Sequence, residues 1–293
     1  MLHSLEIESI RFLHQFRTPW LDHFFKGLDL FDRPEFFFLL IPIVWLGIGW
    51  KSGLKLFYVL LLSAVTNHGL KELFLSPRPF HLDPALGIIQ VSGLGFPSGA
   101  AQTVILLSGL LWKSWQGRWK WVGIIGYIAL VSFSRIYLGL HFPSDILGGW
   151  LVGFALFMIY HRMFPILEML FMGMNPFFLF LLSQAVPGLL LFFSNATLIL
   201  RIGSVAIGIG VGLFLSHAYQ LFLEPPQGRK QFLLRGAIGV IGAFLCYGLI
   251  LWIFPSPSKM HLFLQFSFLG LWLGLGSHVF CRLLLKQKAS SHA

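Results

Sequence analysis

The sequence has few charged residues and almost no cysteine. Lys, Arg, Asp and Glu make up 11% of its 293 residues, hydrophobic residues make up 56%, and the mean hydropathy is +0.79. This composition excludes an ordinary soluble domain. The two cysteines, Cys246 and Cys281, fall within apolar stretches, where a small buried side chain suits packing. The sequence contains no disulfide framework and no metal-ligand spacing pattern.

Long apolar stretches are abundant instead, and several approach the roughly 20 residues that a helix needs to cross a bilayer. The stretches predict spanning helices near 35–50, 54–75, 97–112, 121–138, 144–163, 175–194, 198–220, 232–254 and 261–284. The fold predicted is therefore an all-α, polytopic helical bundle with about nine transmembrane helices.

Three regions can be separated along the chain. Residues 1–33 mix charged side chains with Ile, Leu, Phe and Trp, a pattern too charged to span and typical of an amphipathic segment in the interface. Residues 34–163 form a five-helix core that carries every motif described below. Residues 166–293 form an accessory four-helix transmembrane region without a comparable cluster of ionisable groups.

The net charge of +10 is informative through its placement. With nine spans, one face would carry Lys51, Lys55, Lys113, Arg118, Lys120, Arg162, Arg229, Lys230, Arg235, Arg282, Lys286 and Lys288. The positive-inside tendency assigns this face to the cytoplasm, so the motifs would face the extracytoplasmic side of the inner (plasma) membrane. Because the cations are scattered among short loops, we expect no nucleic-acid partner.

The first two motifs place cations and a helix start at membrane boundaries. Lys71 and Arg78 could be anchors that reach the interface, but Arg is also a planar fork that can hold two phosphate oxygens. Ser98 and Gly99 introduce the next apolar stretch. They could form an ordinary cap, or a helix N-terminus that receives an anion.

The third motif pairs a histidine with a carboxylate. Asp145 follows His141 by four residues and can accept one imidazole N–H, which leaves the other ring nitrogen free as a nucleophile or base. A lone histidine at a helix start is usually structural. Here Arg135 accompanies the pair at a membrane boundary, where ionisable groups favour a functional interpretation.

The combined spacing Lys-x6-Arg-Pro, Pro-Ser-Gly and Ser-Arg-x5-His-x3-Asp resembles the three-part signature of the type 2 phosphatidic acid phosphatase superfamily. The resemblance covers roughly residues 34–163. It implies that phosphate oxygens are held by Lys71, Arg78, Ser98, Gly99 and Arg135. It also implies that His141 attacks phosphorus to give a phosphohistidine, that Asp145 orients it, and that no metal or other cofactor takes part.

The sequence departs from that signature at Ala100, where the family pattern has a histidine that protonates the leaving alkoxide. Losing such an acid costs about 10²–10⁴ in rate. Three explanations remain open: an engineered inactivating change, natural divergence with a substitute acid, or a protein that binds without catalysis. His81, two residues after the first motif, is the best substitute among the other histidines.

Two functional hypotheses follow. The leading one is a bacterial-type integral membrane lipid phosphatase or phosphotransferase, whose partners are a lipid phosphate or isoprenoid (di)phosphate substrate and the membrane lipids. The alternative is a non-catalytic membrane protein that binds or translocates a lipid phosphate. Diffuse apolar contact with the lipid tail leaves the particular lipid open.

Overall fold

The protein is all-α. The computed structural model describes residues 2–114, 117–253 and 258–285. Its helices are α1 (Leu2–His14), α2 (Pro19–Leu28), η1 (Asp29–Asp32), α3 (Pro34–Gly47), α4 (Trp50–Phe74), α5 (Pro79–Leu82), η2 (Pro84–Leu86), α6 (Gly99–Ser114), α7 (Lys120–Tyr137), α8 (Pro143–Phe171), α9 (Pro176–Phe193), α10 (Thr197–Ala218), α11 (Gly228–Ile253), α12 (Lys259–Leu271), the π-helical turn η3 (Trp272–Gly276) and α13 (Ser277–Leu285).

The predicted all-α polytopic membrane fold is confirmed. Among the described residues, six helices are long and apolar enough to cross a membrane, and two shorter apolar helices, Pro34–Gly47 and Gly99–Trp112, accompany them. Each predicted helix corresponds to a helix of the structure, although η3 interrupts the last one with a π-helical turn. The number of nine spans stays a prediction.

The largest error in a predicted helix boundary is at the end of α8. The apolar pattern predicted a helix end at residue 163, but α8 continues to Phe171 with Pro165 inside it. An internal proline removes one backbone hydrogen bond, which argues for a helix end in a soluble protein. Helices in membranes tolerate it because neighbouring groups satisfy the freed carbonyl. The predicted start of the accessory region, residue 166, therefore lies inside the continuous helix α8 and not in a loop.

The chain divides into two compact units. Unit 1 comprises Met1–Phe36 and Val59–Leu167, and unit 2 comprises Phe37–Tyr58 and Glu168–Ala293. All three motifs belong to unit 1. Residues 37–58, which the sequence analysis placed with the motif-bearing core, group with the C-terminal helices instead. In unit 2, α10 and α12 approach closely at Gly208, where a Cβ atom would lie 1.9 Å from a backbone oxygen.

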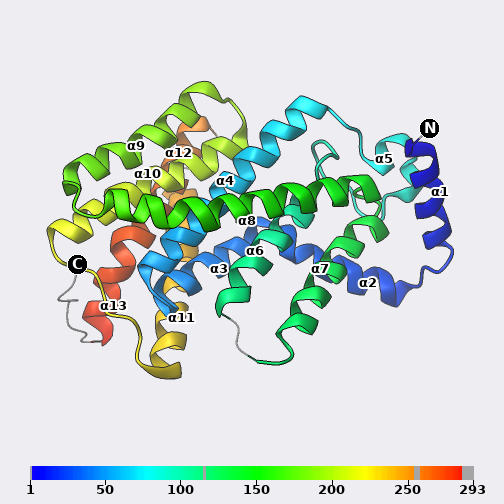
Figure 1. Cartoon of the computed structure of the whole chain (residues 1–293). Coiled ribbons are helices and arrows are strands. Elements are labelled where there is room, and N and C mark those ends of the chain that lie inside the picture. The colour runs from blue at the N-terminus through cyan, green and yellow to red at the C-terminus, as the bar shows by residue number, and fades with distance from the viewer. Residues whose placement is uncertain (1, 115–116, 254–257, 286–293) are drawn as a thin grey trace. The chain divides into compact units, whose positions relative to one another are not determined.

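The N-terminal segment packs against the motif-bearing part of unit 1, as Figure 1 shows for α1 and α2 beside α7. Ile10 is fully buried against Leu86 and Phe142. Polar groups of the segment also have partners there: the Tyr137 hydroxyl donates to Asp22 at 2.7 Å. The segment is therefore part of the packed core of unit 1, which brings its acids close to the motifs.

A buried amide network joins α4 to α6. Gln102 Nε2 donates to the hydroxyl and the carbonyl of Ser63, at 2.7 and 2.8 Å. Asn67 Nδ2 donates to Gln102 Oε1 at 3.0 Å and to the Pro97 carbonyl at 3.2 Å. Because buried amides must be hydrogen-bonded, this network fixes the register of the two helices and the start of α6.

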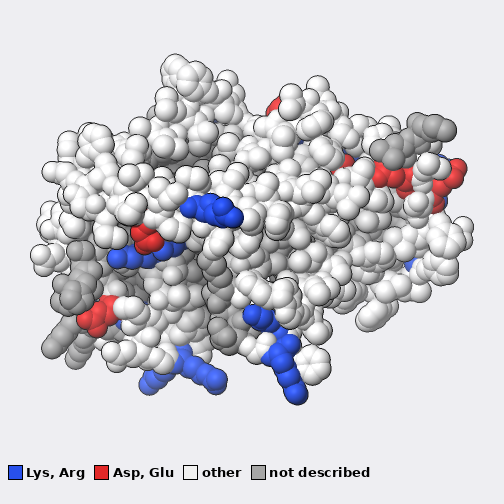
Figure 2. All heavy atoms as spheres, viewed as in Figure 1, with Lys and Arg blue, Asp and Glu red and all other residues white. Residues whose placement is uncertain are grey.

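Charge is unevenly distributed over unit 1. Figure 2 shows acidic atoms gathered over α1 and cationic atoms at the start of α7, with mostly uncharged surface between them. Arg118, just before α7, is exposed. Lys286 and Lys288, which the sequence analysis counted among the cytoplasmic cations, lie outside the described residues.

Candidate active site

His141 and Asp145 form a buried pair at the start of α8. Nδ1 of His141 lies 3.3 Å from Oδ2 of Asp145, and the same oxygen accepts the Phe142 backbone N–H at 2.9 Å. Nε2 of His141 lies 3.2 Å from Nη1 of Arg78. A guanidinium can only donate, so Nε2 accepts, and the ring proton is on Nδ1, facing the carboxylate.

The turn between α7 and α8 sets the position of the histidine. Gly139 has φ +70°, and a Cβ atom on it would lie 1.9 Å from the Leu86 oxygen. This conformation and this approach both require glycine. The backbone N–H groups of Leu140 and His141 then donate to the carbonyl of Arg135, at 3.0 and 3.3 Å. His141 is thereby tied to the last turn of α7.

The cations of the first motif hold the loop that leads to α6. Arg78 is 7% exposed, and it donates through Nε to the Gly93 carbonyl at 2.8 Å and through Nη1 to the Leu140 carbonyl at 3.0 Å. Nζ of Lys71 donates to the carbonyls of residues 94–95. Arg78 therefore joins the loop of the first motif to the turn of the third.

The second motif contributes backbone as well as side-chain groups. The Ser98 N–H donates to the Asp145 carbonyl at 3.0 Å, and the Ser98 hydroxyl accepts the Ala101 N–H at 3.4 Å. Gly99 is the first residue of α6, and a Cβ atom there would lie 3.3 Å from the side-chain oxygen of Asn67. These contacts place the N-terminus of α6 directly beside the His141–Asp145 pair.

Ala100 lies in an apolar environment. It is 2% exposed and forms a buried cluster with Val104 and Val131. Partly buried side chains packed against this cluster are Phe31, Tyr127 and Ile128. The position at which the family pattern has a proton donor is therefore closed by aliphatic and aromatic side chains, one of which comes from η1.

Arg135 has acidic partners that the sequence analysis missed. It is fully buried, and its Nη1 donates to Oδ1 of Asp29 at 2.6 Å and lies 3.6 Å from Oδ2 of Asp32. Its Nη2 has no hydrogen-bond partner among the described residues. Asp29 also accepts from Arg33 at 2.6 Å. Both carboxylates come from η1, about a hundred residues away in the sequence from the arginine that they approach.

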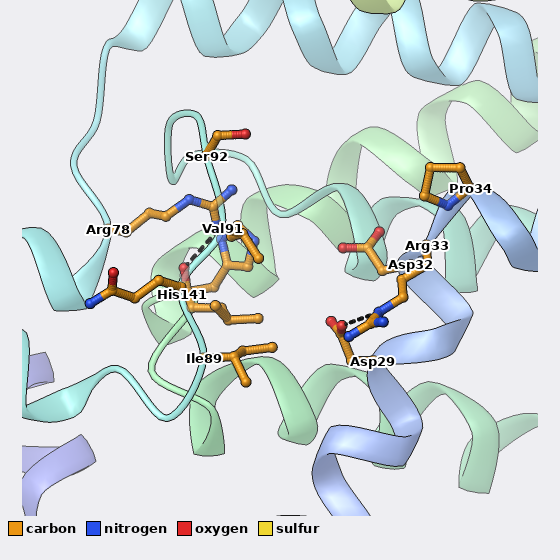
Figure 3. Close-up of a pocket in the computed structure, with 11 residues that line it drawn as sticks. Asp29, Asp32, Arg33, Pro34, Arg78, Ile89, Val91, Ser92 and His141 are labelled. Carbon is orange, nitrogen blue, oxygen red and sulfur yellow. Dashed lines mark hydrogen bonds and ion pairs between the residues drawn. The ribbon is translucent and has the colours of Figure 1, made fainter. Parts of the chain in front are cut away.

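A cavity of about 370 Å³ opens between η1 and the motif loops. It is lined by Asp29, Asp32, Arg33, Pro34, Arg78, Ile89, Gln90, Val91, Ser92, Leu140 and His141. Figure 3 shows Arg78 and His141 on one side of it and Asp29, Asp32 and Arg33 on the other. Of the predicted site residues, Arg78 and His141 reach the cavity wall, and Lys71, Ser98, Arg135 and Asp145 contact the groups behind it.

The electrostatics of the cavity favour a neutral histidine. Burial lowers the pKa of His141 well below 6.5, and the cations Arg78, Lys71 and Arg135 lower it further. A neutral imidazole keeps the lone pair that a nucleophile requires.

His81, the predicted substitute acid, lies outside the residues that line the cavity. It is exposed on α5, and its Nδ1 accepts the backbone N–H of Arg78 at 3.2 Å. Within the described part of the chain, no group of three or more His, Cys, Asp or Glu side chains is arranged to hold a metal ion.

Fold and site together define a class: a multi-pass membrane protein with a buried His–Asp pair among cationic side chains. Comparison with known proteins specifies it. Residues 52–168 match the model of the PAP2 superfamily. Phosphatidylglycerophosphatase B of Bacillus subtilis is 30% identical over 157 residues, which cover 49% of this chain and 75% of the relative. The chain belongs to the PAP2 superfamily.

Three further matches also cover part of the chain. Undecaprenyl-diphosphatase of Sulfolobus acidocaldarius is 29% identical over 35% of this chain and 50% of its own length. Lipid A 4'-phosphatase of Bacteroides thetaiotaomicron is 24% identical over 52% of this chain and 73% of its own. A crystal structure of a PAP2-type phosphatidylglycerolphosphate phosphatase from Bacillus subtilis is 26% identical with a TM-score of 0.46, over 54% of this chain and 83% of that chain. The family and the named relatives support a hydrolase of the lipid phosphatase kind.

Proposed function

We propose that this protein is an integral membrane phosphatase or phosphotransferase that cleaves a lipid mono- or diphosphate through a phosphohistidine on His141. One observation carries the proposal: the His141–Asp145 pair is buried, with Nδ1 facing the carboxylate and Nε2 facing Arg78 at the wall of a cavity. This arrangement supports a neutral histidine nucleophile beside a cation that can receive phosphate.

The reaction would proceed in two steps. A phosphate entering the cavity replaces Nε2 of His141 as the acceptor of the Arg78 guanidinium, which frees the lone pair of Nε2. The Nε2 atom then attacks phosphorus, and Asp145 stabilises the positive charge that develops on the ring. Lys71, Arg135 and the N-terminus of α6 at Ser98 supply the positive field behind the cavity. In the second step, water cleaves the phosphorus–nitrogen bond and restores the histidine.

The substrate class follows from the membrane setting and the relatives. The named relatives act on phosphatidylglycerophosphate, undecaprenyl diphosphate and a lipid A phosphate. A lipid phosphate or isoprenoid (di)phosphate suits a polar cavity in a protein with apolar helices, because the tail stays in the bilayer while the headgroup enters. A diphosphate would be the less demanding substrate, since its phosphate leaving group is less basic than an alkoxide.

A second candidate function is binding or translocation of a lipid phosphate without turnover. It is favoured by the apolar packing around Ala100, which excludes a proton donor from that position. Nη1 of Arg135 also donates a hydrogen bond to Asp29 and is therefore not available to a phosphate oxygen. The two candidates differ in one observable, the release of inorganic phosphate.

Phosphate release from a panel of lipid phosphates in detergent micelles tests the proposal. We expect turnover by the unaltered protein and by Glu8→Gln, a control that changes an exposed carboxylate of α1. His141→Ala should abolish turnover, whereas His141→Asn should still bind phosphate through the cations. Full activity of purified His141→Ala would refute the role of His141, and binding without release by the unaltered protein would favour the second candidate.

We further propose that the cavity faces the extracytoplasmic side of the inner membrane. The cations at the start of α7 and the acids over α1 lie at opposite ends of unit 1, which supports this orientation through the positive-inside tendency. With Cys246 and Cys281 replaced by alanine, an impermeant thiol reagent should label Ser92→Cys in intact cells and spare Arg118→Cys. The reverse labelling pattern would show that the orientation is inverted.

A further inference from the structure

We propose that Asp32 is the general acid of this protein and protonates the leaving group in place of the histidine that Ala100 replaces. The inference rests on the proposed phosphatase function and adds a catalytic residue from the N-terminal segment. It starts from the cavity, whose lining brings Asp32, Arg78 and His141 together.

Asp32 has the position that a proton donor needs. Figure 3 shows its carboxyl group projecting into the cavity from the wall opposite Arg78 and His141. Its Oδ2 lies 3.6 Å from Nη1 of Arg135, too far for a hydrogen bond, and its side chain is 36% exposed. A phosphate attacked by His141 has its leaving oxygen on the side away from the nucleophile. In this cavity, that side is the wall formed by η1.

The neighbouring residues of η1 explain how Asp32 reaches this wall. Phe31 packs against the apolar cluster of Ala100, Val104 and Val131. Asp29 is anchored on the other side by its 2.6 Å hydrogen bond from Arg135. Alanine at position 100 adds little bulk to the cluster that Phe31 packs against, and this docking of Phe31 carries the neighbouring Asp32 to the cavity wall. The small residue at position 100 and the placement of Asp32 are thus linked through the packing of Phe31.

The surroundings of Asp32 also favour its protonated form. Burial raises the pKa of its carboxyl group, and the negative charge of Asp29 adds to this rise, whereas Arg135, Lys71 and Arg78 oppose it. The other titratable groups that line the cavity are His141 and Arg33, and Tyr127, outside the lining, lies close enough to interact electrostatically with Asp32. A bound phosphate dianion would raise the pKa again, because it adds negative charge beside the carboxylate. Burial and the bound phosphate thus both shift the carboxyl group of Asp32 toward the protonated form.

The proton balance of the reaction is complete with this residue. The Nε2 lone pair of His141 forms the phosphorus–nitrogen bond while the bond from phosphorus to the lipid oxygen breaks. The released oxygen takes the proton of Asp32, which becomes a carboxylate. Water then attacks phosphorus and gives its proton to Asp32, and the electron pair of the phosphorus–nitrogen bond returns to Nε2. The net reaction consumes one water molecule and regenerates both side chains.

The test compares Asp32→Asn with the unaltered protein on two substrates, an alkyl lipid monophosphate and a lipid diphosphate. Asparagine preserves the size of the side chain and cannot donate a carboxylic proton. We expect kcat on the monophosphate to fall about 10²–10⁴-fold, and kcat on the diphosphate to fall less, because its leaving group needs protonation less. The ratio of the two rates does not depend on the folded fraction, so a partial folding defect cannot mimic this result. Glu8→Gln should leave the ratio unchanged.

The pH profile gives a second readout. The rate of the unaltered protein should fall at high pH as Asp32 loses its proton, and Asp32→Asn should lack this alkaline limb. An equal loss on both substrates, or an unchanged alkaline limb, would assign Asp32 a structural role and overturn the inference. The same selective loss in His81→Ala instead of Asp32→Asn would also overturn it.

If His141→Ala alone is inactive and Asp32→Asn behaves like the unaltered protein, only this inference fails. No turnover by the unaltered protein refutes the proposed function as well.

Discussion

The packing of Phe31 near Ala100 makes a quantitative prediction for Ala100→His. The alanine is 2% exposed in a closed apolar cluster, so an added imidazole ring must displace its neighbours. Overpacking a core costs about 1–3 kcal/mol. Leaving the buried ring nitrogens without partners costs about 1–3 kcal/mol more. We therefore expect a loss of stability of about 2–6 kcal/mol and no gain in turnover from this single change.

Removing Phe31 should make room for the new ring. Phe31→Ala alone truncates a half-buried side chain and should cost about 1–3 kcal/mol. Because both changes act on the same space, the double variant should be more stable than the sum of the single effects by about 0.5–3 kcal/mol. Equilibrium unfolding in mixed detergent micelles measures this coupling. Phe12→Ala is the control, because it removes a side chain of α1 that is 61% exposed. Its effect on the free energy of unfolding should simply add to the effect of Ala100→His.

Additivity of Ala100→His and Phe31→Ala within about 0.5 kcal/mol would refute the reasoning. It would mean that the two positions do not share space, and the argument that a small residue at position 100 allows η1 to dock would fail. The proposed role of Asp32 would then lose its structural explanation, although its kinetic test would stand.

Three further predictions concern the turn, the buried arginine and the histidine. Gly139→Ala should abolish folding or activity because its Cβ atom would lie 1.9 Å from a backbone oxygen. Gly126→Ala is the control and should be tolerated, because the space around Gly126 is open. Thermal-shift and activity measurements compare the two variants. Asp29→Asn weakens the charged hydrogen bond of buried Arg135 and should lower the free energy of unfolding by about 1.5–3 kcal/mol, measured by detergent-micelle unfolding. Because the pKa of His141 is lowered below 6.5 and the neutral form attacks, kcat/KM should persist as the pH falls through 6.5; an acid limb at or above that pH would contradict this assignment.

The sequence predicted the helices well because their apolar stretches are long. Each predicted helix is present, and the largest error in bounds lies at the end of α8, which accommodates Pro165. The local parts of the site were also predictable. His141 and Asp145 are four residues apart, and this spacing at the start of a helix brings the imidazole and the carboxylate together in the structure.

The acidic wall of the cavity was not predictable in the same way. Asp29 and Asp32 reach Arg135 only because η1 folds back onto α6 and α7, a contact between distant parts of the chain. The amphipathic pattern of residues 1–33 indicated an interfacial segment and did not show its packing partner. One signal was present: the first 35 residues hold six of the eleven acids, namely Glu6, Glu8, Asp22, Asp29, Asp32 and Glu35. In a chain poor in acids, such a concentration could have directed attention to the buried cations.

The central claim is that His141 carries the phosphoryl group, and trapping the intermediate tests it most directly. The unaltered protein is mixed with a lipid diphosphate labelled in its terminal phosphate, quenched at alkaline pH within the first turnover, and digested for mass spectrometry. We predict an acid-labile, alkali-stable phosphoryl group on the peptide that contains His141, and none in His141→Ala. Phosphate release without label on His141, together with activity in His141→Ala, would contradict the account.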